Sequence, residues 1–203
     1  MIRNIVFDWS GTLSDDMHPC YLATMEVFRT YNISEISYEE FRNEIEYPYM
    51  KFYRKFCDKI SKEQADRVFF EAIHRSPDPM LFPGAREVIE SLHKTGVRMI
   101  VVSGVPEKKI QIEAKQYQVE TYFHKIYGSV YDKIDIVREA LSRHDFSPEQ
   151  TLYVGDMDHD IHAGKASGLK TAASSWGYHT RSRLEGENPD FMLEHLFDLL
   201  GIV

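Results

Sequence analysis

Short, continuous apolar runs recur along this chain, and each is broken at once by a small or charged residue. The clearest are Ile5–Phe7, Met99–Val102 and Thr151–Val154. Runs of this length are typical of strands buried on both faces, as in a parallel sheet. Between the later runs, apolar residues recur at three- and four-residue steps, which predicts crossover helices. The pattern therefore indicates an α/β fold.

The stretch from Thr12 to about Ile73 keeps helical spacing instead. Apolar residues form a stripe on a helix expected to begin near Pro19, and two later segments match capping boxes: Tyr21, Leu22, Met25, Phe28 and Tyr31; Ser37–Glu40; Ser61–Gln64. Ser76–Pro79 is rich in turn residues. We therefore predict a doubly wound, Rossmann-like parallel sheet core (1–15 and 80–203) with a small helical cap domain (16–79) inserted after the first strand.

Within this expected cap, Tyr47–Phe56 interleaves aromatic residues with the cations Lys51, Arg54 and Lys55. One interpretation is a helix that packs its aromatic side chains while the cations face water. The other is a substrate lid whose cations meet an anionic ligand. Both interpretations are open on the sequence alone.

Composition narrows the classes of function. The chain has 203 residues, with 24 Lys and Arg against 32 Asp and Glu, a formal charge of −8. It has no dense basic run that could follow a phosphate backbone, so we expect no nucleic-acid partner. No apolar run approaches the ~20 residues of a membrane span, and the start resembles no signal peptide. A soluble, cytoplasmic protein without a membrane partner is expected, and Cys20 and Cys57 are expected to be reduced thiols.

Reactive side chains gather where the predicted strands end. Asp8 follows the first strand, Ser103 and Gly104 follow Met99–Val102, and an acidic cluster from Asp156 to Asp160 follows Thr151–Val154. The carboxyl ends of parallel strands meet at one edge of the sheet, where α/β folds bind their ligands. A carboxylate there can accept a phosphoryl group, hydroxyl and N–H groups can hold phosphate oxygens, and carboxylates can bind Mg²⁺.

These residues, together with Lys133, resemble the motifs of the haloacid dehalogenase superfamily of aspartate-nucleophile phosphatases. The resemblance implies that Asp8 is the nucleophile and a metal ligand, that Ser103 and Lys133 bind the phosphoryl group, and that Asp156 and Asp160 complete a Mg²⁺ site. Two further stretches are similar to the phosphoglycolate phosphatase branch in particular: Asp160–Thr171 and Trp176–Tyr178.

One position departs from the family pattern. Hydrolytic members usually carry a second aspartate, a general acid and base, two positions after the nucleophile, and Ser10 stands there in this chain. The resemblance still implies that Ser10 coordinates the metal through its backbone carbonyl. Slow turnover is expected, because a serine hydroxyl is a poor substitute for a positioned acid and base. Asp15, Asp16 and His18 are possible substitutes.

The remaining residues of the first loop complete the expected phosphate site. The backbone N–H groups of Trp9, Ser10 and Gly104 are expected to hold phosphoryl oxygens, and Gly11 and Thr12 belong to the same binding loop. Structural roles compete with these functions: Gly11 and Thr12 could only turn the chain, Asp158 could be a helix N-cap, and Lys133 could be a solvated first-turn lysine.

The leading hypothesis is a Mg²⁺-dependent phosphatase acting on a small phosphorylated metabolite, as a monomer or homodimer. A phosphonatase is the nearest alternative, with a cap lysine forming a Schiff base: Lys51, Lys55, Lys59 or Lys62. A third possibility is a phosphate- and metal-binding module that has lost turnover through Ser10. A carbon–halogen hydrolase is disfavoured, because that chemistry has no use for the acidic cluster around Asp156.

Overall fold

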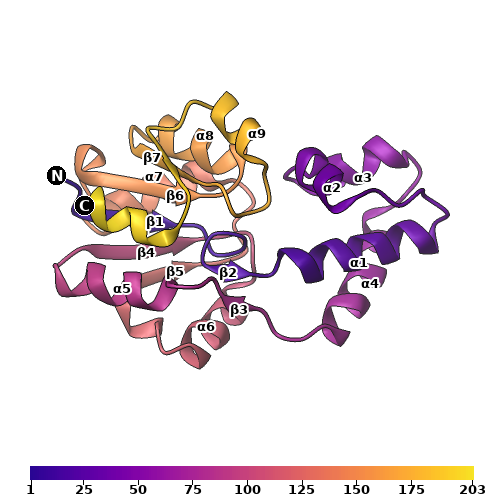
Figure 1. The fold of residues 1–203 in the computed structure, drawn as a ribbon, viewed down its shortest axis with the longest axis horizontal. Helices are drawn as coiled ribbons and strands as arrows, with labels where there is room; N and C mark the ends of the chain where they lie inside the picture. Colours follow the sequence, from indigo (N-terminus) through magenta and orange to yellow (C-terminus); the bar gives the residue numbers. More distant parts are fainter. The chain divides into compact units, whose positions relative to one another are not determined.

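A computed structural model describes all 203 residues of the chain. Its main element is a six-stranded sheet in which every neighbouring pair is parallel (Figure 1). In spatial order the strands are β5 (Phe123–Tyr127), β4 (Arg98–Val102), β1 (Asn4–Phe7), β6 (Thr151–Gly155), β7 (Lys170–Ser174) and β8 (Phe191–Leu193). This is the doubly wound order of a Rossmann-like fold, so the predicted fold class is confirmed.

The strand order reverses at β1. From β1 the chain builds outward through β4 to β5, and it then crosses to β6 on the other side and builds outward through β7 to β8. Crossovers that leave in opposite directions open a crevice beyond the carboxyl ends of the two central strands. The residues that follow Phe7 in β1 and Gly155 in β6 are therefore the ones that the topology places at a ligand site.

Side chains of the central strands alternate between two apolar layers. Phe7 and Val154 pack on one face with helices α5 (Ala85–Lys94) and α6 (Glu107–Gln116). Val6 and Tyr153 pack on the other face with α7 (Lys133–Arg143) and α8 (Asp158–Ala166). Both faces are thus covered, which explains the continuous apolar runs of the sequence. Three further short helices belong to the same part of the chain: α9 (Arg181–Gly186), η1 (Glu120–Tyr122) and η2 (Pro148–Gln150).

The chain ends in a leucine-rich 3₁₀ helix, η3 (Leu196–Gly201). Its buried residues Leu196 and Leu199 are three positions apart. That spacing places them on one face of a helix with three residues per turn, so the apolar contact is made without an α-helical turn.

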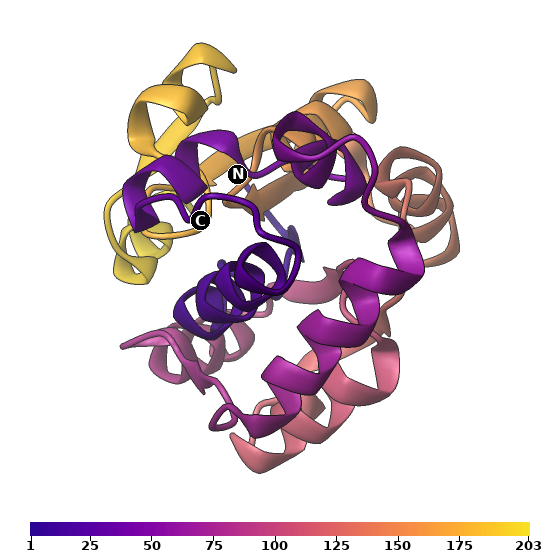
Figure 2. The same ribbon diagram turned by 90° about the vertical axis from the view of Figure 1, so that its right-hand side faces the viewer.

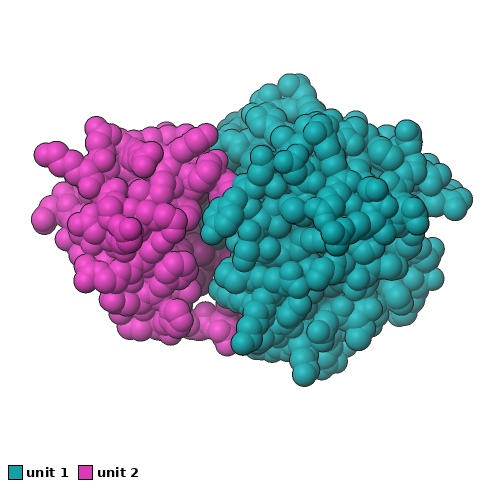
Figure 3. All heavy atoms as spheres, turned by 180° about the vertical axis from the view of Figure 1, so that it is seen from behind, with its two compact units in different colours: residues 1–15, 81–203 teal, residues 16–80 magenta.

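The chain divides into two compact units, coloured separately in Figure 3: residues 1–15 with 81–203, and residues 16–80. The second unit holds four helices, seen at the front in Figure 2: α1 (Met17–Thr30), α2 (Tyr38–Glu44), α3 (Met50–Phe56) and α4 (Lys62–Arg75). Two short strands, β2 (Ser14–Asp15) and β3 (Met80–Leu81), pair with each other. Neither strand was predicted from the sequence, because two residues are too few to show the alternation that indicates a strand.

Aromatic packing forms the interior of the second unit. Phe28 of α1 stacks on Phe52 of α3, and Phe52 meets Phe41 of α2 edge to face. The capping box at Ser61 is present in full, so the predicted start of α4 is correct. Helix α1 begins at Met17, two residues before the expected start.

The cations interleaved with these aromatics are exposed. Lys55 pairs with Glu44 at 3.0 Å and Glu46 at 2.5 Å. Packing of the aromatics therefore explains the spacing, and a lid function stays a prediction. No helix in either unit combines the length and the apolar character that crossing a bilayer requires.

Candidate active site

Asp8 lies at the carboxyl end of β1, beside the point where the strand order reverses. Its backbone N–H continues the parallel ladder by donating to the Val154 carbonyl at 2.9 Å. Its side chain is held from both sides: the Trp9 N–H donates to Oδ1 at 2.7 Å, and Lys133 Nζ lies 3.1 Å from Oδ2. The carboxylate is thereby fixed in one orientation. The Trp9 N–H thus holds the carboxylate of Asp8, and its binding of a phosphoryl oxygen stays a prediction.

Backbone hydrogen bonds to two carbonyl groups stabilise the loop after Asp8. The Trp9 carbonyl accepts the N–H groups of Leu13 and Ser14 at 2.9 and 2.8 Å, and the Gly11 N–H donates to the Ser14 carbonyl at 2.9 Å. Gly11 has φ +75°, and a Cβ there would overlap the carboxylate of Asp156. Glycine is therefore required both for the left-handed backbone and for this close approach.

Asp156 follows β6 and is fully buried. Its Oδ1 accepts the Thr12 hydroxyl at 2.8 Å, and its Oδ2 accepts the Tyr178 backbone N–H at 2.6 Å. Gly177 carries no Cβ where one would overlap Asp156. Loops after two different strands therefore close around this one carboxylate. Thr12 does more than turn the chain, because its hydroxyl orients Asp156.

Lys133 and Asp160 form the second half of the cluster. Lys133 begins α7 and is buried, with Nζ 2.7 Å from Asp160 Oδ1. Asp160, in the first turn of α8, also accepts the Tyr153 hydroxyl at 3.2 Å and the Met157 N–H at 3.1 Å. The alternative of a solvated Lys133 is wrong, because its ammonium is enclosed between two carboxylates. Asp158 is also not the N-cap of α8, since Met157 occupies that position.

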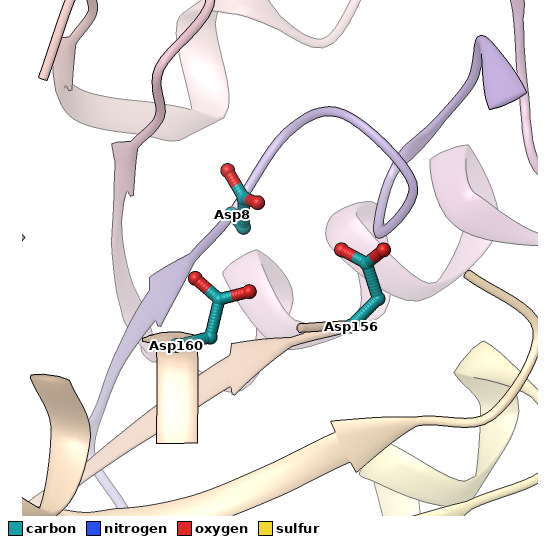
Figure 4. A group of neighbouring side chains, drawn as sticks. All are labelled: Asp8, Asp156 and Asp160. Carbon is teal, nitrogen blue, oxygen red and sulfur yellow. The ribbon is translucent and has the colours of Figure 1, made fainter. Parts of the chain in front are cut away.

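Three buried carboxylates converge at this place. Figure 4 shows Asp8, Asp156 and Asp160 as neighbours, the first two just after the ends of β1 and β6 and the third in α8, and ligand oxygens of all three lie within 4.8 Å of one another. Only one buried cation, Lys133, faces them. Full ionisation would leave two negative charges uncompensated in the interior, which is strongly unfavourable. The carboxylate donor set and its charge therefore fit a divalent, oxygen-loving cation such as Mg²⁺.

The pKa values reflect the same imbalance. Burial, followed by the charges of Asp8 and Asp160, raises the pKa of Asp156 well above its usual value. Burial also raises the pKa of Asp8, against the opposing effect of Lys133. The pKa of Lys133 is raised well above its usual value, because Asp160 and Asp8 outweigh the effect of burial. The cluster thus holds more negative charge than the protein alone neutralises.

Ser103 directly follows β4 and is buried, and a hydrogen bond from its hydroxyl opposes the rise that burial causes in the pKa of Asp8. The half-buried Gly104 follows it. Ser10 is also half-buried, and its hydroxyl donates to the Tyr178 hydroxyl at 3.5 Å. The residues expected to hold the phosphoryl group and the metal therefore lie at one edge of the sheet. Asp15 is exposed in β2, and Asp16 and His18 belong to the second unit. A role as substitute acid stays a prediction for all three.

Three contacts at this site were not anticipated. The Tyr178 N–H binds Asp156, the Trp176 indole donates to the Thr12 carbonyl at 3.2 Å, and the Trp9 indole donates to buried Glu113 at 2.6 Å. In the sequence, Trp176–Tyr178 contributed to the family resemblance, but no structural role was predicted for these residues. Gly177 between two aromatic residues was the available signal for a tight turn. Glu113 offered no signal, because it reads as an ordinary helix glutamate.

Comparison with known proteins agrees with this geometry. The family model of haloacid dehalogenase-like hydrolases matches residues 5–174. The chain belongs to this family. The pyrophosphatase PpaX of Bacillus thuringiensis (strain Al Hakam) is 26% identical over 211 residues, covering 100% of this chain and 96% of that protein. The sequence-based identification of a phosphatase-type hydrolase of this family is thereby confirmed.

Solved structures share the fold. A haloacid dehalogenase-like family hydrolase from Streptococcus pneumoniae superposes with a TM-score of 0.84 at 23% identity, covering 99% of this chain and 98% of that one. A protein described as a predicted phosphoglycolate phosphatase from Haemophilus somnus gives 0.81 at 19% identity, with 99% and 97% covered. CbbY from Rhodobacter sphaeroides, in complex with phosphate, gives 0.73 at 20% identity, with 98% and 96% covered.

Proposed function

We propose that this enzyme is a Mg²⁺-dependent phosphatase that hydrolyses a small phosphorylated metabolite through an aspartyl phosphate on Asp8. The observation that carries the proposal is the buried cluster of three carboxylates and one lysine at the point where the strand order reverses. A phosphate monoester brings negative charge to an acidic site, so turnover requires both a fixed nucleophile and added positive charge.

In the first step, a carboxylate oxygen of Asp8 attacks phosphorus and the bond from phosphorus to the leaving oxygen breaks. That oxygen leaves as an anion or takes up a proton from water. Lys133, with its raised pKa, stays charged and offsets charge on the transferring group. The Ser103 hydroxyl and the Gly104 N–H lie at the end of the adjacent strand β4 and are assigned to the phosphoryl oxygens. In the second step, water attacks the aspartyl phosphate, the bond to Asp8 breaks, and phosphate leaves with the carboxylate restored.

The metal would be held by Asp8, Asp156 and Asp160, with the backbone carbonyl of Ser10 as a further ligand. When bound, Mg²⁺ supplies charge neutralisation and polarises phosphoryl oxygens. Burial raises the pKa of both Asp8 and Asp156. Both carboxylates would therefore gain from a bound cation.

The nature of the leaving group follows from Ser10. Positioned acid and base groups contribute about 10²–10⁴ in rate, and a serine hydroxyl supplies little of this. Substrates whose leaving oxygen needs no proton are the least affected, which favours phosphoanhydrides, acyl phosphates and aryl phosphates over alkyl phosphates. That PpaX is a pyrophosphatase supports pyrophosphate as a second candidate substrate.

The phosphonatase alternative requires a cap lysine with an unprotonated amine. Partial burial lowers the pKa of Lys55, but hydrogen bonds with Glu46 and Glu44 outweigh this effect and raise it. A hydrogen bond with Asp66 raises the pKa of Lys62 as well. Both lysines are thus poor candidates for a Schiff base. The alternative then depends on Lys51 or Lys59, and borohydride trapping with phosphonoacetaldehyde tests it.

Steady-state phosphate release from a substrate panel, with and without Mg²⁺, tests the proposal. The panel should pair pyrophosphate, acetyl phosphate and an aryl phosphate with alkyl phosphates such as phosphoglycolate. We expect Mg²⁺-dependent release, fastest from the first group and lost in Asp8→Asn. Release that persists in excess EDTA would remove the metal from the proposal. Phosphate binding without release from any substrate would favour the binding module.

A further inference from the structure

Glu113 is a buried charged residue that the proposed chemistry does not use. It lies in the middle of α6, its side chain is 7% exposed, and its neighbours Ile110 and Ala114 belong to the apolar layer that also contains Trp9. A carboxylate among apolar side chains costs free energy unless strong hydrogen bonds compensate for its lost hydration. An apolar residue at this position would avoid that cost, so the partners of Glu113 need an explanation.

Those partners belong to the nucleophile loop. Oε2 of Glu113 accepts the Trp9 indole N–H at 2.6 Å and the Ser14 hydroxyl at 3.4 Å. The third partner, Lys109, is at 3.8 Å on the same helix. A charge-assisted hydrogen bond of 2.6 Å is strong. Glu113 therefore connects α6 to both ends of the loop between Trp9 and Ser14.

The same two residues define the shape of that loop. The Trp9 carbonyl accepts the Ser14 N–H at 2.8 Å, and the Trp9 N–H holds Oδ1 of Asp8 at 2.7 Å. A movement of the Trp9 ring would be transmitted to its own peptide groups, and from there to the Asp8 carboxylate. The ring is fully buried and meets Phe123 edge to face, so it is held by this packing together with its hydrogen bond to Glu113.

We propose that Glu113 is a positioning residue, which holds Trp9 and Ser14 so that the Asp8 carboxylate is aligned for attack on phosphorus. This role rests on the proposed function, because it concerns the same nucleophile. Glu113 makes no contact with the reacting group. It acts on the alignment of the nucleophile, so its loss reduces turnover more than binding. Misplacement of a reacting group by about 1 Å costs about 10²-fold in rate.

Two substitutions separate this role from simple structural support. Glu113→Gln removes the charge and retains an oxygen that can accept the indole N–H. Glu113→Leu removes the acceptor and retains apolar bulk. Glu107→Gln is the matched control, because Glu107 is a half-buried glutamate on the same helix, paired with Lys125 at 3.1 Å and without contact to Trp9. Ser14→Ala removes the second contact independently.

The first readout is the indole N–H signal of Trp9 in ¹H–¹⁵N spectra of the full chain. The chain has two tryptophans, so Trp176→Phe assigns the signals. A strong bond to a carboxylate moves the Trp9 proton downfield. We expect it to move back upfield in Glu113→Leu, to move partly in Glu113→Gln, and to stay in place in Glu107→Gln. An unchanged signal in Glu113→Leu would disprove the contact.

The second readout separates kcat from KM. For Glu113→Leu we expect kcat to fall by about 10- to 100-fold with KM unchanged. Glu113→Gln should restore most of this loss, and Ser14→Ala should cause a smaller one. If Glu113→Leu fails to fold, Ser14→Ala decides, and a wild-type kcat in that variant would overturn the role. A folded Glu113→Leu variant with wild-type kcat overturns it directly. Failure of the wild type to release phosphate from any substrate refutes the proposed function, and the positioning role with it.

Discussion

Lys133 Nζ lies 3.1 Å from Oδ2 of Asp8 and 2.7 Å from Oδ1 of Asp160, and all three side chains are buried. Replacing the lysine by methionine leaves two buried carboxylates without their cation. We expect the free energy of unfolding of the metal-free protein to fall by roughly 3–5 kcal/mol. Activity should fall by about 10²–10³-fold, since a charge that stabilises the transition state is lost. Denaturant unfolding and kcat/KM measure the two effects.

Lys125→Met is the control for this substitution. Its ion pair with Glu107 is also 3.1 Å long, and it is exposed. Exposed pairs contribute about 0–1 kcal/mol, so stability and activity should both stay near those of the wild type. Equal effects of the two substitutions would show that burial of the Lys133 pair has no special importance.

Asp156→Asn should have opposite effects on the metal-free and the Mg²⁺-loaded protein. Removing one of three crowded carboxylates relieves repulsion, and an amide can still meet Thr12 and the Tyr178 N–H. We therefore expect a higher melting temperature without Mg²⁺. The wild type should gain about 2.7 kcal/mol at a Mg²⁺ concentration 100 times Kd, and the variant should gain nothing. Asp158→Asn, two positions away, should keep the wild-type response to Mg²⁺.

The gain from Asp156→Asn should depend on pH in the metal-free protein. The pKa of Asp156 is raised by folding, so the folded state binds more protons than the unfolded state above the ordinary carboxyl pKa. The wild type therefore loses stability as pH rises through the folded pKa, and the variant lacks this loss. The difference in unfolding free energy should grow from about pH 4 towards neutral pH. A difference that is constant with pH would contradict the assignment of uncompensated charge to this cluster.

Ser10→Asp should increase the turnover of alkyl phosphates. It introduces a carboxyl group that can give a proton to the leaving oxygen and take one from water, contributions of about 10²–10⁴ in rate. Ser10→Asn is the matched control, because asparagine has the shape of aspartate but no carboxyl group. Pre-steady-state kinetics of the wild type should show a burst with an aryl phosphate, and the aspartate variant should show a smaller one. Fast alkyl phosphate turnover by the wild type, with no gain in Ser10→Asp, would mean that another group supplies the proton.

Residues 16–80 are expected to carry substrate selectivity as a cap. The exposed cations Lys51 and Arg54 lie on the helix whose Phe52 is buried inside this unit. Lys51→Gln combined with Arg54→Gln should change the order of preferred substrates without changing the melting temperature, since neither side chain is part of the core. The control is Arg29→Gln, which removes an exposed ion pair with Glu35 in the same unit. An unchanged order of substrates would assign these cations to solvent.

Much of the core could be predicted from sequence because its strands are buried on both faces. Short continuous runs such as Met99–Val102, bounded by turn residues, are typical of such strands. Their carboxyl ends placed Asp8, Ser103 and Asp156 at one edge of the sheet. Lys133 also lies beside Asp8, at the site where the sequence predicted it. Its burial was left open, because a first-turn lysine has the same local sequence whether it faces water or two carboxylates.

The contacts that sequence reasoning missed link residues far apart in the chain. Glu113 is 104 positions from Trp9, and Tyr178 is 22 positions from Asp156. No periodicity or local motif indicates such pairs, since each depends on how segments that follow different strands are brought together. The short strands at Ser14–Asp15 and Met80–Leu81 were missed because two residues are too few to show a pattern.

Formation of an aspartyl phosphate on Asp8 tests the account most directly. The wild type, mixed with acetyl phosphate and Mg²⁺ and quenched rapidly in acid, should contain one phosphoryl group on the peptide that holds Asp8. Mass spectrometry locates it, and borohydride reduction of the acyl phosphate confirms the linkage. Asp8→Asn should carry none. Phosphate release by the wild type with no phosphoryl group on Asp8 at any quench time, or labelling of another residue, would contradict the proposed nucleophile.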